Sequence, residues 1–240
     1  MKAVLFTGTL WLLFASLTSA QTCATPPSHW QGNDKRYAKE RNAGDRAFRE
    51  GKYDKALGGY LQALASEDAG GFFEVYFKLG ETYAMVGNFD KAYACLAESG
   101  PGKIPIDRVM AVGIRDEKAR KAAQLLLDTI QLNTPRYPYG TFPEYLALAA
   151  ILRHVGLASQ AQSYEEEGRI SREAANAWDT ALAEGGKHAS LAAADRAAIG
   201  VYERSNRPEP AGILREQLAS EPPLMSRRRP WWFRLDPANW

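Results

Sequence analysis

GDRAFREGKYDKALGGYLQAL (residues 44–64) and GETYAMVGNFDKAYACLAES (residues 80–99) share one order of residue types at a constant offset of 36 residues. The matched positions are Gly44 and Gly80, Gly51 and Gly87, Tyr53 and Phe89, Ala56 and Ala92, Tyr60 and Leu96, and Ala63 and Ser99. Such a period is typical of stacked helical repeats, because each helical pair leaves an apolar face that a neighbouring pair covers. It predicts an all-α fold built from helical hairpins.

The repeated glycines have two expected roles. Gly44 and Gly80 are expected where one helix presses against its partner, because a side chain there would hold the backbones apart. Gly51 and Gly87 are expected to end the first helix of each pair, at the left-handed position that glycine adopts most easily.

Both segments resemble tetratricopeptide repeats, the antiparallel helix pairs that stack into a right-handed superhelix with a concave binding face. The clear resemblance covers residues 37–104, which is under a third of the chain. It implies a helical-hairpin solenoid that binds a protein or peptide.

Beyond residue 104 the pattern weakens, and two alternatives compete. In one, Gly156 is a turn and Ala161 follows it by five positions, which is also the spacing from Gly51 to Ala56. In the other, Gly168 is the turn and Trp178 and Ala181 lie on the next helix. The two exclude each other, because the helix at residues 159–167 would have to play two roles.

A degenerate terminal repeat is expected near the end of the repeat domain, which we place at residues 37–223. Its repeat-like positions are Tyr202, Asn206, Ala211, Leu218 and Pro223. Terminal repeats usually depart from the consensus because they cap the stack.

The resemblance also predicts the residues of a partner-binding groove. Transferred onto the two clear repeats, the groove positions are Arg41, Asp45, Phe48, Arg49, Phe77, Glu81, Ala84 and Met85. Some members of this family clamp a peptide carboxylate with lysines and asparagines, but Asp45 stands where an asparagine is needed and would repel that carboxylate. Phe48, Phe77 and Met85 either accept an apolar anchor or pack against a neighbouring repeat.

No pattern of catalytic residues was found in the sequence. His29, His154 and His188 are scattered, and no HExxH, GxSxG or CxxC motif occurs. Adjacent helical residues point to different sides, so we interpret Glu165–Glu167 as a solvated face. We therefore expect neither an enzyme nor a metal or cofactor site, and the net charge of +2 argues against a nucleic-acid partner.

The N-terminus predicts export. Lys2, the apolar stretch 3–17 and the small residues 18–20 form a signal-peptide pattern over residues 1–20, so the mature chain is expected to begin at Gln21 with an arm at 21–36. An uncleaved anchor and a lipoprotein at Cys23 are the alternatives. We expect a periplasmic or secreted protein.

Export changes how the two cysteines are interpreted. Cys23 and Cys95 are the only cysteines of the chain. In an oxidising compartment such a pair forms either a disulfide or two free thiols. The sequence leaves both alternatives open.

The last segment, residues 224–240, concentrates arginines and aromatic residues. Its candidate binding residues are Arg227, Arg228, Arg229, Trp231 and Trp232. These aromatics either cover the end of the last repeat or dock on a partner or an anionic membrane surface, because tryptophan prefers interfaces and arginine is attracted to acidic head groups. The alternative function is therefore a surface protein that binds membrane or cell-wall polymer through this tail.

Overall fold

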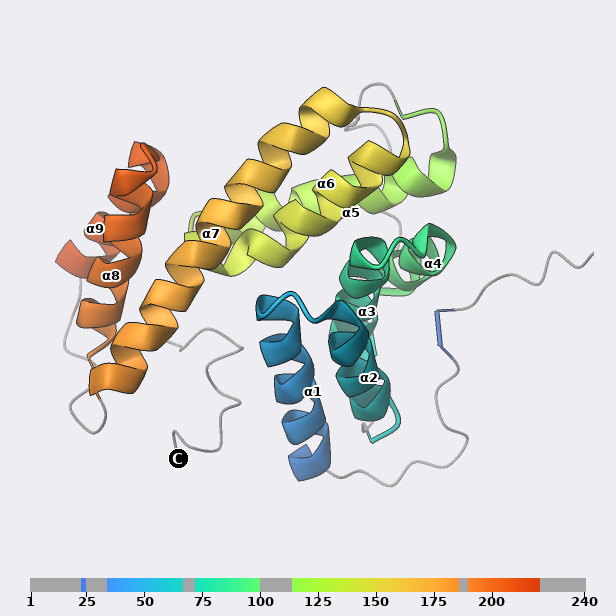
Figure 1. Cartoon of the computed structure of the whole chain (residues 1–240), viewed down its shortest axis with the longest axis horizontal. Helices are drawn as coiled ribbons and strands as arrows, with labels where there is room; N and C mark the ends of the chain where they lie inside the picture. Colours follow the sequence, from blue (N-terminus) through green and yellow to red (C-terminus); the bar gives the residue numbers. More distant parts are fainter. Residues whose placement is uncertain (1–22, 25–33, 67–71, 100–113, 186–189, 221–240) are drawn as a thin grey trace, which may run out of the picture.

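The computed structural model describes residues 23–24, 34–66, 72–99, 114–185 and 190–220, and every regular element in these ranges is a helix (Figure 1). In chain order they are α1 (Asp34–Arg49), α2 (Tyr53–Leu64), α3 (Phe72–Met85), α4 (Phe89–Ser99), α5 (Glu117–Asn133), the short 3-10 helix η1 (Pro138–Thr141), α6 (Phe142–His154), α7 (Ala158–Gly185), α8 (Leu191–Arg204) and α9 (Pro208–Ala219). The predicted all-α class is confirmed.

Four helical pairs, α1–α2, α3–α4, α6–α7 and α8–α9, are joined by the same backbone turn. In each turn one residue is left-handed, its N–H donates to the carbonyl three residues earlier, and the next N–H donates to the carbonyl five residues before itself. This is the Schellman arrangement that satisfies the last carbonyls of a helix. The left-handed residues are Gly51, Gly87, Gly156 and Asn206.

A fully buried alanine follows each of these turns by five residues. The four alanines are Ala56, Ala92, Ala161 and Ala211. Because each lies in the first turns of the second helix, its small side chain lets that helix lie close to the first. The predicted turns at Gly51, Gly87 and Gly156 are confirmed, and Asn206 supplies the fourth.

The close contacts expected at the other repeated glycines are also confirmed. A Cβ atom at Gly44 would lie 2.6 Å from the ring of Tyr60, and one at Gly80 would lie 2.6 Å from the Leu96 side chain. Sequence reasoning missed Gly59, where a Cβ would lie 2.8 Å from the backbone nitrogen of Gly44. The α1–α2 crossing is therefore built on two facing glycines.

The alternative that placed a turn at Gly168 is wrong. Gly168 lies inside α7, where a Cβ would come within 2.9 Å of the Leu146 side chain on α6. The 28-residue helix α7 packs against α6 and also against α8, and Trp178 belongs to it as well. One long helix thus packs against a neighbour on each side, as Figure 1 shows for α7, drawn in yellow to orange.

Most packing joins elements that follow one another in the chain, but α3 also packs against α6. This contact brings the first half of the molecule (α1–α4) against the second half (α6–α9). A further link is the ion pair between Arg49 on α1 and Asp179 on α7. The predicted groove residues of α1 and α3 are therefore partly covered by α6 and α7.

A disulfide joins Cys23 to Cys95 on α4. Both cysteines are buried, and the backbone N–H of Cys23 donates to the Glu98 carboxylate at 3.0 Å. Of the alternatives that the sequence left open, the structure contains the bridge.

Several predicted features lie outside the described residues. They are the signal peptide, most of the arm, Pro223, His29, His188 and the tail with Arg227, Arg228, Arg229, Trp231 and Trp232.

Candidate functional site

A small pocket lies where α1, α2 and α3 meet η1, α6 and α7. It holds about 30 Å³ of free space, which admits no more than a few water-sized groups. Its lining residues are Asp45, Phe48, Arg49, Tyr60, Lys78, Glu81, Gly140, Phe142, Pro143 and Ala175. Four of the predicted groove residues, Asp45, Phe48, Arg49 and Glu81, thus line one pocket together.

One carboxylate of this pocket has partners from two other helices. Lys78 Nζ lies 2.9 Å from Asp45 Oδ1, and the Tyr60 hydroxyl donates to the same oxygen at 2.8 Å. The Lys78 ammonium also lies 5.7 Å from the centre of the Tyr60 ring. Burial, followed by the charge of Asp45, raises the pKa of Tyr60, so the phenol stays protonated and continues to donate.

Two further carboxylates, Glu81 on α3 and Glu144 on α6, are buried beside this network. Burial raises the pKa of Glu144 to about 7, although its own backbone amide and the Lys78 charge oppose the shift. Burial also raises the pKa of Glu81, and the negative charge of Glu144 adds to the effect. Oxygens of both groups, Glu81 Oε1 and Glu144 Oε2, are enclosed without a hydrogen-bond partner.

The predicted groove residues differ in how far they reach the surface. Arg41, Asp45, Phe48, Glu81 and Ala84 are buried, while Arg49, Phe77 and Met85 are half-buried. Phe48 packs edge-on against Tyr53, with ring centres 5.2 Å apart, and contacts Phe142. Of the two roles expected for Phe48, the structure shows packing against neighbouring side chains.

Ion pairs between helices tie the groove residues to their surroundings. Arg41 on α1 binds Glu74 on α3 at 2.6 Å. Asp45 and Lys78 form a second contact between α1 and α3, and Arg49 reaches Asp179 on α7. Helices α1 and α3 are thus held together by charge as well as by apolar packing.

Lys78 and Glu144 were not predicted from the sequence. Lys78 lies three residues before Glu81, so a charged pair on one helix face was visible. Glu144 stands in the otherwise apolar stretch FPEYLALAA (142–150). A carboxylate in the first turn of a helix is common, because the helix dipole stabilises a negative charge there. The sequence therefore offered no reason to expect that Glu144 is buried.

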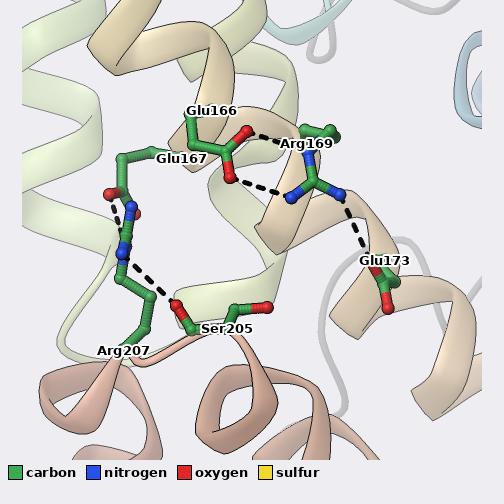
Figure 2. Close-up of polar contacts among 6 residues, drawn as sticks. All are labelled: Glu166, Glu167, Arg169, Glu173, Ser205 and Arg207. Carbon is green, nitrogen blue, oxygen red and sulfur yellow. Dashed lines mark hydrogen bonds and ion pairs between the residues drawn. The ribbon is translucent and has the colours of Figure 1, made fainter.

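The three adjacent glutamates on α7 do not form a carboxylate pair. Glu165 contacts Arg153, Glu166 accepts two hydrogen bonds from Arg169, and Glu167 accepts one from Arg207 at 2.6 Å. Figure 2 shows Glu166 and Glu167 turned toward different arginines. Each carboxylate has its own cation, which fits a solvated face.

A second hollow lies beside the α3–α4 and α6–α7 turns. Its lining includes Asp90, Tyr93 and Asp116, and His154, an exposed residue, stacks on Phe89 with ring centres 3.8 Å apart. Asp116 already caps α5 by accepting from the Ala119 N–H at 2.7 Å. None of the predicted groove residues lines this hollow.

In the described ranges, no group of three or more histidine, cysteine or acidic side chains is arranged to hold a metal ion. Among the same residues, no helix combines the length and apolarity that crossing a membrane requires.

Comparison of the chain with protein-family models, with curated proteins and with solved structures gave no match in any of the three.

Proposed function

We propose that this chain is an exported, tetratricopeptide-like solenoid that binds a protein or peptide partner along the inner face of α1 and α3. The observation that carries the proposal is the partial exposure of three predicted groove residues, Arg49, Phe77 and Met85, because the pocket that other groove residues line is too small for a peptide. The four identical turns support a stacked arrangement of hairpins.

The accessible part of this surface is chemically mixed. Arg49 keeps about a quarter of its side chain exposed, and Phe77 and Met85 are half-buried apolar groups on α3. Aromatic residues, methionine and arginine are enriched at protein interfaces. A partner segment with an apolar anchor for Phe77 and Met85 fits this composition, while Arg49 already pairs with Asp179.

Site-specific photo-crosslinking tests the proposal. A photoreactive residue at Phe77 or Met85 is expected to capture the same partner, while one at the exposed Lys55 on α2 is the matched control. Capture from Lys55 as strong as from Phe77 and Met85 contradicts a binding surface on the inner face.

Truncation separates this function from binding through the tail. A chain that ends at Glu221 lacks the arginines and tryptophans of the tail. It is expected to keep the crosslinks from Phe77 and Met85. If truncation abolishes all capture, the tail is the binding element instead.

Intact-mass measurement of protein recovered from the producing cell tests export. The expected mass is that of a chain beginning at Gln21. The mass of the full chain, or of a lipid-modified Cys23, contradicts this proposal.

A further inference from the structure

Glu81 and Glu144 place two buried acidic groups where α3 packs against α6. One oxygen of each carboxyl group is enclosed without a hydrogen-bond partner. Burying a carboxylate without a counter-charge or hydrogen bonds is costly, so such groups favour their protonated form. The contact between the two halves is therefore more favourable when this pair retains a proton.

The surrounding charges do not balance the pair. On α3, Lys78 acts on both glutamates but also binds Asp45 of α1. Arg49 of α1 is engaged with Asp179 of α7. Three carboxylates, Asp45, Glu81 and Glu144, thus lie around one ammonium group.

Among the described residues that line the pocket, the remaining walls add no cation. Tyr60 of α2 is neutral because burial raises its pKa, and Gly140 of η1 and Ala175 of α7 are uncharged. The excess negative charge in this part of the described structure therefore depends on whether Glu81 and Glu144 are protonated.

The direction of the pH effect follows from linkage. A carboxyl group whose pKa is higher in the closed contact than in water favours the closed contact at low pH. Burial raises the pKa of Glu144 from its ordinary value of 4.5 to about 7. The advantage of the closed contact therefore falls as the pH rises across this interval. The charge repulsion between Glu81 and Glu144 acts in the same direction.

We infer that Glu81 and Glu144 form a proton-sensitive latch between the first and second halves. With a proton on the pair, the α3–α6 contact stays closed. When the proton passes to solvent, the two charged carboxylates repel each other, the contact loosens and the adjoining pocket widens. The importance of this widening rests on the proposed function, because the pocket belongs to the proposed binding surface.

Amide hydrogen exchange without any partner tests the latch. Exchange rates are first corrected for the intrinsic effect of pH. In wild type, protection of residues 75–85 and 144–152 is then expected to fall about tenfold between pH 6 and pH 8. This factor follows from a Glu144 pKa of about 7 in the closed contact and about 4.5 in the open one. Glu144→Gln removes the titrating group and keeps its shape, so the fall should largely disappear. Glu117→Gln on α5 changes an exposed glutamate and should leave it unchanged.

Glu81→Gln provides a second variant in case Glu144→Gln does not fold, which circular dichroism would reveal. Equal wild-type protection at both pH values, or a full pH effect in every folded glutamine variant, overturns the latch. Because no partner is present, this result is independent of the crosslinking test. Loss of crosslinking with an intact latch contradicts only the proposed function.

Discussion

The first half, α1–α4, and the second half, α6–α9, use the same turn but distribute their helices differently. In the first half each hairpin has its own two helices, and the 36-residue period follows directly from that. In the second half α7 is 28 residues long and packs against both α6 and α8. Conservation of the turn therefore does not require conservation of the repeat length.

Two ion pairs, one from each half, differ in how far they are exposed. Asp45 and Lys78 in the first half form a buried ion pair, with side chains less than a tenth exposed. Arg169 and Glu166 in the second half form an exposed pair (Figure 2). These two ion pairs therefore place the same chemistry once in the core and once at the solvated surface.

The largest difference between the halves is expected from the disulfide, which acts on the first half. Cys95→Ser releases a bridge across 72 residues and is expected to lower the free energy of unfolding by about 4 kcal/mol. Chemical denaturation of wild type, with and without reductant, measures the same loss independently. If neither the substitution nor reduction changes stability, the bridge does not hold the arm to α4 in solution.

Removing one partner from each ion pair sharpens the comparison of charge. Lys78→Met leaves buried carboxylates without their cation and is expected to cost about 3 kcal/mol, whereas Arg169→Met should cost less than about 0.5 kcal/mol. The Lys78 effect should be smaller at pH 5 than at pH 8, because protonation neutralises Glu81 and Glu144 at low pH. Thermal melting at both pH values measures this, and equal losses for the two variants would contradict the assigned burial.

Helix crossings in the two halves are expected to tolerate side chains equally poorly. Gly80→Leu and Gly168→Leu should each cost about 2 kcal/mol or more through overpacking, because a Cβ already meets Leu96 or Leu146. Gly58→Ala is the control, since its Cβ would meet nothing within 4 Å, and it should stabilise by about 0.5 kcal/mol through helix propensity. A stable Gly168→Leu variant would show that α7 does not cross α6 this closely.

The turns should give the smallest effects and the closest agreement between halves. Gly87→Ala and Gly156→Ala are each expected to cost about 1 kcal/mol, because both positions have positive φ. Gly87→Asn should cost less, since asparagine occupies this position at Asn206. Urea denaturation of the three variants tests the ranking, and an asparagine variant less stable than the alanine variant would contradict it.

Sequence reasoning predicted local geometry well where a single residue determines it. Gly51, Gly87 and Gly156 were identifiable because only a few residue types adopt positive φ easily. The length of α7 was not, because Gly168 reads equally as a turn or as a close contact, and only the packing against Leu146 distinguishes the two.

The candidate site was predicted less completely than the fold. The transferred positions include Asp45 and Glu81, but the environment of Glu81 depends on Glu144 of α6, which lies more than 55 residues further along the chain. Neither the Glu81–Glu144 pair nor the Arg49–Asp179 ion pair has a local sequence pattern, because each joins elements that are distant in sequence. Contacts of this kind require the tertiary arrangement.

The shared helix α7 has a consequence for how the molecule unfolds. Its 28 residues span about 42 Å, and both α6 and the α8–α9 hairpin rest on it. If either neighbour unfolds, one end of α7 becomes exposed while its other end stays packed. The residues of α7 then remain helical, so partial unfolding of the second half gains little conformational entropy from them. The second half should therefore unfold as one cooperative unit, whereas the first half, with separate hairpins, can open one hairpin at a time.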